Sequence, residues 1–214
     1  MAVKIKICGL MRPTDVSRAV EAGASYLGVV FAGGPRTVTP QQVIELVRAS
    51  AGVPVLGVFA DQSAEEILQI SEQTGLSGAQ LHGPYSQADA EQIRAAGLEV
   101  WRVVRIAAPQ DLDAVNRAIA GSDAVLVEPL VPLALGGSGV PLELAVASEA
   151  RARLAGHSMV LAGGLTPDTV AKALAWVRPD IVDVSSGVEV LPGIKDHRKI
   201  ARFAEAVFAH SPIT

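Results

Sequence analysis

The chain has 214 residues, 50% of them hydrophobic and 19% charged, with a formal net charge of -4 and a single cysteine, Cys8. One cysteine excludes a disulfide framework, and the absence of Lys/Arg clusters with only 4% aromatic residues excludes a nucleic-acid-binding surface. The longest apolar stretch, residues 26–34, is shorter than the ~20 residues of a membrane span, and no signal-peptide pattern opens the chain. We therefore expect a soluble, cytoplasmic protein with one domain over residues 1–214 and no membrane partner.

Eight short runs rich in Val, Ile and Leu recur along the chain. They cover residues 4–8, 26–31, 55–60, 78–81, 99–105, 124–127, 158–162 and 181–184. Near-continuous apolar runs of this length are typical of strands buried on both faces, as in a parallel sheet. Segments with helical spacing separate the runs, most clearly at residues 63–74, 86–96, 109–120, 141–154, 167–177 and 196–209.

The strict alternation of strand and helix, at about 27 residues per unit, predicts an α/β fold, a (β/α)8 TIM barrel. The alternative is an open doubly wound sheet, which usually carries a glycine-rich first turn. The first turn here, residues 8–12, lacks that glycine pattern. In a barrel, chemistry lies at the C-terminal ends of the strands and in the loops that follow them.

Glycine-rich loops follow the sixth, seventh and eighth strands. Glycine lets backbone N–H groups approach an anion closely, and the last two loops of such barrels often bind phosphate. Any one of these loops is equally compatible with ordinary turn glycines, but two neighbouring loops of this kind favour a phosphate site. The candidate binding residues are Gly137, Gly139, Gly163, Gly164, Ser185, Ser186 and Gly187.

Three further residues lie where a barrel would place them at its mouth. Cys8 ends the first strand. Its side chain is either a small buried hydrophobic group or a thiolate that acts as a base. Glu128 closes the sixth strand and is expected to point into the mouth as an acid or base. Arg36 can bind a carboxylate through two hydrogen bonds or lie in water.

Other polar residues have less distinctive positions. His82 is expected to be structural, and Asp183 to accept hydrogen bonds from nearby backbone groups. Alternation is expected to direct Lys6 away from the interior, which leaves the barrel without an interior lysine. No group of side chains has metal-ligand spacing, so no metal is predicted.

Several segments taken together resemble the phosphoribosylanthranilate isomerase family, over essentially the whole chain. They are KICGL (6–10), GPR (34–36), QLHG (80–83), GGSG (136–139), LAGGL (161–165), VDVSSGVE (182–189) and PGIKD (192–196). The resemblance implies an Amadori rearrangement of a phosphoribosyl substrate without cofactor or metal. It also implies that Cys8 is the base, Glu128 the acid, Arg36 the ligand of the anthranilate carboxylate and the glycine loops the phosphate site.

The sequence departs from the family pattern at the acid. The family usually has an aspartate at the end of the sixth strand, and the extra methylene of Glu128 extends its reach by about 1 Å, a displacement that can change a rate ~100-fold. The aromatic residue that often follows the GGSG loop is also missing, and Pro141 to Leu144 occupy that place.

Two alternatives remain open at this point. One is another phosphosugar barrel, such as the histidine-pathway aldose isomerase or indole-glycerol-phosphate synthase. The other is a phosphate-binding barrel without catalysis, which would have no need of Cys8 and Arg36. Either a monomer or a homodimer is compatible with the sequence.

Overall fold

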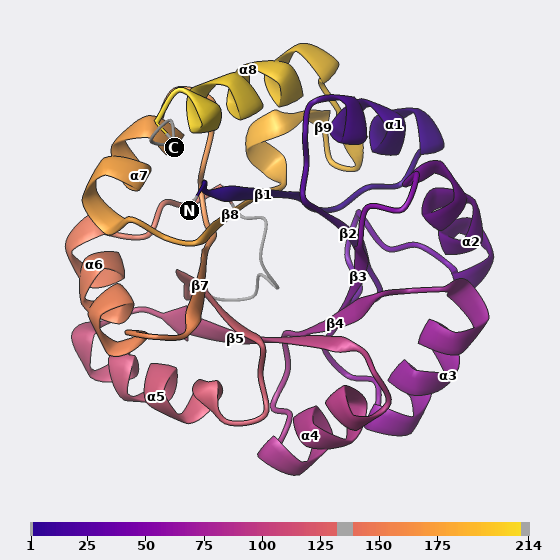
Figure 1. The fold of residues 1–214 in the computed structure, drawn as a ribbon, viewed down its shortest axis with the longest axis horizontal. Coiled ribbons are helices and arrows are strands. Elements are labelled where there is room, and N and C mark those ends of the chain that lie inside the picture. Colours follow the sequence, from indigo (N-terminus) through magenta and orange to yellow (C-terminus); the bar gives the residue numbers. More distant parts are fainter. Residues whose placement is uncertain (1, 132–138, 211–214) are drawn as a thin grey trace.

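The computed structural model describes residues 2–131 and 139–210. Eight parallel strands form a closed barrel, in which each strand pairs with the next along the chain and β8 pairs with β1 (Figure 1). The strands are β1 Lys4–Ile7, β2 Tyr26–Val30, β3 Val55–Phe59, β4 Gly78–Leu81, β5 Glu99–Ile106, β6 Ala124–Pro129, β7 Ser158–Leu161 and β8 Ile181–Val184. The predicted TIM barrel is confirmed, and the open-sheet alternative is excluded.

Helices surround the barrel on the outside and cover the sheet (Figure 1). Within the described residues they are α1 Pro13–Glu21, α2 Pro40–Ala49, α3 Ala64–Thr74, α4 Gln87–Ala95, α5 Asp113–Ile119, α6 Leu144–Arg153, α7 Val170–Val177 and α8 His197–Phe208. Capping boxes start three of them, with Thr39, Ser63 and Ser86 as the N-cap residues. None of the helices in the described part of the chain is long and apolar enough to span a membrane.

Three helix starts differ from the prediction. The segment 109–120 divides into a 3-10 turn, η1 Pro109–Leu112, and α5, because Asp111 accepts hydrogen bonds from the N–H groups of Ala107 and Ala108. The helix predicted from residue 141 begins at Leu144, and the helix predicted from 167 begins at Val170. Before α7, the hydroxyls of Thr166 and Thr169 bond to local N–H groups, which competes with helix formation.

The core has two large apolar layers and a small cluster of Cys8, Ala32, Val58 and Ala60. The larger one lies between the barrel and the helices. The smaller one fills the barrel interior with residues from alternate positions of the strands, as the period of two requires. Its members are Tyr26, Leu56, Trp101, Ala124, Leu126, Val160, Ala162 and Ile181. This packed interior supports the mouth of the barrel from below.

An antiparallel ribbon, which the sequence pattern does not predict, joins the eighth strand to the last helix. The 3-10 turn η2 Ser186–Val188 leads into β9 Glu189–Leu191, and β10 Ile194–Lys195 returns to α8. Figure 1 shows β9 beside α1 and α8 at the rim of the barrel.

Candidate active site

A cavity of about 540 Å³ opens at the C-terminal ends of the barrel strands. Most of the predicted site residues line it, namely Cys8, Arg36, Glu128, Gly163, Gly164, Ser185 and Ser186. Gly139 and Gly187 lie in the adjoining loops but are not part of its lining, and Gly137 lies outside the described residues. The structure therefore brings together residues from five of the eight strand ends.

Cys8 follows β1 and is 7% exposed. Its N–H donates to the carbonyl of Val184 on β8, which holds the residue at the rim. A side chain at Gly28 would lie 2.7 Å from the Cys8 sulfur, so only glycine leaves room for the thiol there. Burial raises the pKa of the Cys8 thiol, and the positive charge of Lys6 counteracts part of that rise.

Lys6 lies inside the barrel, contrary to the prediction. Its ammonium donates to Asp183 Oδ2 and to Gln80 Oε1, both at 2.9 Å, and its side chain is fully buried. Burial alone would lower its pKa, but the charges of Asp183 and Cys8 raise it, so Lys6 keeps its proton. The signal was available, because Lys6 and Cys8 are two residues apart and side chains two apart on a strand share a face.

Asp183 is the partner of that lysine. The prediction that it accepts hydrogen bonds from the backbone is wrong, because Oδ2 accepts from Lys6 and Oδ1 has no hydrogen-bond partner among the described residues. A buried carboxylate is stable only when it is paired, and the lysine supplies the opposite charge. Asp183 is thus part of the polar floor of the cavity, and Lys6 lies buried against it.

Glu128 lies within β6 and faces the cavity, with its side chain 7% exposed. His82 Nε2 lies 2.9 Å from Glu128 Oε1, and Arg105 Nε lies 3.6 Å from the same oxygen. Neither approach has the alignment of a hydrogen bond within the described residues. His82, expected in a structural role among the loops, therefore lines the cavity next to the carboxyl group.

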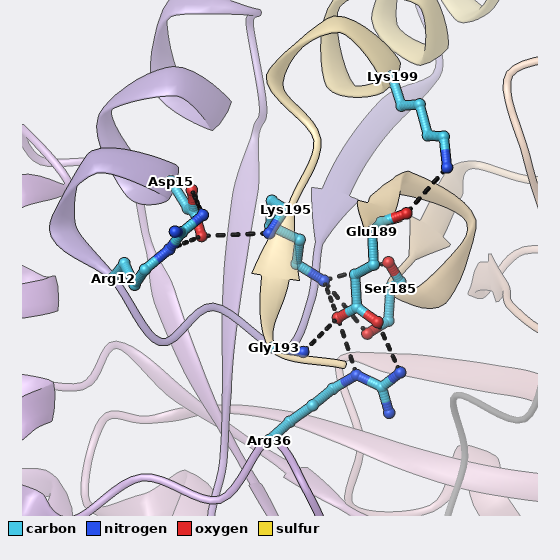
Figure 2. A network of polar contacts seen from close by, with 8 residues as sticks. All are labelled: Arg12, Asp15, Arg36, Ser185, Glu189, Gly193, Lys195 and Lys199. Carbon is cyan, nitrogen blue, oxygen red and sulfur yellow. Dashed lines mark hydrogen bonds and ion pairs between the residues drawn. The ribbon is translucent and has the colours of Figure 1, made fainter. Parts of the chain in front are cut away.

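Arg36 does not lie free in water. Its Nε and Nη2 donate to the two carboxylate oxygens of Glu189 at 2.9 and 2.7 Å, while the side chain also lines the cavity (Figure 2). Glu189 was not predicted as its partner, since 153 positions separate the two residues and no local pattern links them.

The glycine loops pack closely on one another. Gly163 and Gly164 have φ of 92° and 64°, a conformation that glycine adopts without strain. A side chain at Gly164 would lie 2.6 Å from the Pro141 nitrogen, and one at Gly139 would lie 3.7 Å from Ser186 Oγ. The N–H groups of Gly163 and Gly164 make no backbone hydrogen bond among the described residues.

Within the described residues, no group of three or more His, Cys, Asp and Glu side chains has an arrangement that could hold a metal ion. A thiol, a carboxyl group, an arginine and glycine loops share one cavity at the C-terminal face of a closed parallel barrel. In barrels of this kind the active site lies at that face. The fold and site thus define a TIM-barrel enzyme with acid/base groups at its mouth.

Comparison with known proteins identifies the family. The profile of N-(5'phosphoribosyl)anthranilate (PRA) isomerase matches residues 5–206. The N-(5'-phosphoribosyl)anthranilate isomerase of Magnetococcus marinus is 40% identical over 212 residues, which cover 97% of this chain and 96% of that protein. The chain belongs to the phosphoribosylanthranilate isomerase family.

Solved structures agree with this assignment. The crystal structure of phosphoribosyl anthranilate isomerase from Thermotoga maritima is 31% identical and superposes with a TM-score of 0.87, covering 96% of this chain and 98% of that one. Another is of the isomerase in complex with reduced 1-(o-carboxyphenylamino)-1-deoxyribulose 5-phosphate, at 29% identity and a TM-score of 0.84, with coverage of 96% and 98%. The protein converts N-(5-phosphoribosyl)anthranilate to 1-(2-carboxyphenylamino)-1-deoxyribulose 5-phosphate in tryptophan biosynthesis.

Proposed function

We propose that Cys8 is the general base and Glu128 the general acid of this rearrangement. One observation carries the assignment: the thiol and the carboxyl group line the same cavity from β1 and β6, on different sides of the barrel mouth. A sugar bound between them would present its ring oxygen and its C2 proton to different residues.

The reaction needs two proton transfers. Glu128 gives its proton to the furanose ring oxygen, the bond between that oxygen and C1 breaks, and a protonated Schiff base forms. The Cys8 thiolate then removes the proton from C2, and the electron pair forms the C1–C2 double bond of an enolamine. Gain of a proton at C1 and loss of the proton from the C2 hydroxyl give the ketone, so the isomerisation consumes no other reagent.

The Lys6 ammonium supports the base in this scheme. A thiol that removes a proton must first be a thiolate, and a buried thiolate is stabilised by a neighbouring cation. Lys6 lies on the same face of β1 and is held in place by Asp183 and Gln80. Lys6 acts on Cys8 and not on the substrate, so it is a positioning residue.

We assign the two anionic ends of the substrate to different parts of the rim. The phosphate is bound by Gly137, Gly139, Gly163, Gly164, Ser185, Ser186 and Gly187, with N–H groups in loops where glycine admits close approach. The anthranilate carboxylate is bound by Arg36, whose planar guanidinium matches a carboxylate. The enzyme thus binds a small phosphoribosyl compound at both of its anionic ends. We further propose that it acts in the cytoplasm, as a monomer or a homodimer.

The loss of substrate fluorescence on conversion tests the assignment. We expect wild-type protein to turn the substrate over and Glu128→Gln to lose roughly 100-fold or more in kcat, because proton transfer by a positioned group contributes 10²–10⁴-fold. Glu72→Gln, an exposed glutamate on α3, is the matched control and should keep wild-type rates. Equal turnover by wild type and Glu128→Gln would move the acid to another residue.

A further inference from the structure

The ribbon of β9 and β10 has no role in the scheme above, although its residues belong to the segments through which the chain resembles its family. It begins at Glu189 and ends at Lys195, and both side chains point toward Arg36 and Ser185 (Figure 2). We propose that Glu189 is a positioning residue that holds Arg36 with one edge of the guanidinium facing the substrate carboxylate, and that Lys195 ties this pair to the loop of Ser185. The proposal rests on the role assigned to Arg36 above.

The geometry of the Arg36–Glu189 pair leaves part of the guanidinium for a ligand. Nε and Nη2 lie on one edge of the guanidinium, and both donate to Glu189. Nη1 has no partner among the described residues, and Arg36 lines the cavity. A carboxylate entering the cavity therefore meets the donors that Glu189 leaves unused.

The pair is also held rigidly. The Glu189 side chain is 5% exposed and that of Arg36 14%, and a two-point ion pair fixes the plane of the guanidinium. Holding a binding group in its bound conformation reduces the entropy lost when the ligand binds. Glu189 thus contributes to affinity without contacting the substrate.

Lys195 connects this pair to the proposed phosphate loop. Its ammonium donates to Glu189 Oε1 at 2.8 Å, to the Ser185 carbonyl at 3.1 Å and to Ser185 Oγ at 3.4 Å. The side chain is fully buried, and the Gly193 N–H donates to the same carboxylate oxygen at 3.2 Å (Figure 2). One buried ammonium therefore sets the spacing between the residues assigned to the two ends of the substrate.

Opposite charges in this network stabilise one another. Burial works against the charged form of Glu189, but the hydrogen bond from Arg36 and the charge of Lys195 outweigh it and lower its pKa. Burial lowers the pKa of Lys195, and the charge of Glu189 counteracts part of that fall. Glu189 therefore lies between the two basic side chains, Arg36 and Lys195. Gly9, the neighbour of Cys8, packs closely against this network, because a side chain at Gly9 would lie 2.6 Å from Arg36 Cδ and 2.8 Å from Ser185 Oγ.

Two ligands separate positioning from general support of the fold. They are the reduced product, reduced 1-(o-carboxyphenylamino)-1-deoxyribulose 5-phosphate, and the same compound without its ring carboxylate. Isothermal titration gives Kd for each ligand with wild type, Glu189→Gln and Arg36→Gln. Glu21→Gln, which breaks an exposed pair with Arg18, is the matched control.

We expect Glu189→Gln to weaken binding of the carboxylated ligand roughly 10- to 100-fold and binding of the other ligand less than about twofold. KM for the substrate should rise with little change in kcat. Equal weakening of both ligands, or no weakening of either, would overturn the proposal. If circular dichroism shows that Glu189→Gln does not fold, Glu189→Asp replaces it. This variant keeps the charge and draws Arg36 back, so it should show the same selective loss to a smaller degree. An unselective effect would overturn the proposal.

The Arg36→Gln variant distinguishes the two levels of the inference. Selective weakening in Arg36→Gln but not in Glu189→Gln would retain Arg36 as the carboxylate ligand and overturn the role of Glu189. An Arg36→Gln variant that weakens both ligands equally would overturn the assignment of Arg36 itself, and the proposal with it.

Discussion

On the β8–β1 side of the barrel mouth, Lys6 contacts Asp183 at 2.9 Å and Arg36 contacts Glu189 at 2.7 Å, each through hydrogen bonds of good geometry. On the β4–β6 side, Glu128 has only one approach as short, to His82 at 2.9 Å, and it lacks hydrogen-bond alignment within the described residues. One side therefore holds its charges in hydrogen-bonded pairs, whereas on the other a buried carboxyl group has an imidazole and a guanidinium nearby without hydrogen-bond alignment among the described residues.

The difference matches the roles proposed for Arg36 and Glu128. A group that binds an anion works best when it is fixed before the anion arrives. A general acid must exist with and without its proton, and strong hydrogen bonds to the carboxylate form alone would hold it in that form. Glu128, the proposed acid, makes no aligned hydrogen bond through Oε1 among the described residues.

Removal of the proposed base should have the largest effect. Cys8→Ser replaces the thiol with a hydroxyl that ionises far less readily, and we expect kcat to fall roughly 100- to 10,000-fold. Titration with the reduced product should give a Kd close to that of wild type, because Arg36, the proposed carboxylate ligand, and its pair with Glu189 are untouched. Unchanged turnover would remove Cys8 as the base.

The second largest effect is expected from breaking the Lys6–Asp183 ion pair. Lys6→Met leaves Asp183 buried without its cation, and we expect the free energy of unfolding, measured in urea, to fall by about 3–5 kcal/mol. The double variant Lys6→Met/Asp183→Asn should recover part of the loss. In the single variant, alkylation of Cys8 by iodoacetamide should also shift to higher pH, and an unchanged alkylation profile would separate the lysine from the thiol.

The side-chain length at Glu128 can be tested by shortening the acid. Glu128→Asp keeps the acid but draws it back by one methylene, so we expect kcat to fall roughly 10- to 100-fold while KM changes little. Glu72→Asp, at an exposed position of α3, controls for the substitution. A faster Glu128→Asp enzyme would mean that the cavity is shaped for the shorter acid of the wider family.

The smallest effect is expected from acid, which should lower the folding stability by protonating Asp15. Arg12 and His197 donate to Asp15, and although burial opposes it these bonds lower the pKa of the Asp15 carboxyl group. A carboxyl group with a lowered folded pKa adds stability above its unfolded pKa of about 3.9, and this stability is lost as the pH falls through the folded pKa.

The measurement is urea unfolding of wild type and Asp15→Asn between pH 3 and pH 7. The stability difference between them should be greatest at neutral pH and shrink at the acidic end. Asp168→Asn, which removes an exposed carboxylate, is the control. A difference that stays constant down to pH 3 would contradict the expected protonation of Asp15.

Local sequence patterns were sufficient for the elements and for the loops that carry the site. Apolar runs and helical spacing predicted the eight strands and their alternation with helices, because these features depend on neighbouring residues. The order of the strands in a barrel then located Cys8, Glu128 and the glycine loops at one face. Local patterns did not predict the ribbon 189–195, because its two strands are only three and two residues long.

The sequence by itself determined the barrel, the face that carries the chemistry and the residue types gathered there. The tertiary structure alone decided which charges pair. Lys6 meets Asp183 across 177 positions, Arg36 meets Glu189 across 153, and His82 approaches Glu128 from another strand. Such pairs form only when barrel closure places distant strand ends side by side, and at that distance along the chain no local preference records which charge will face which.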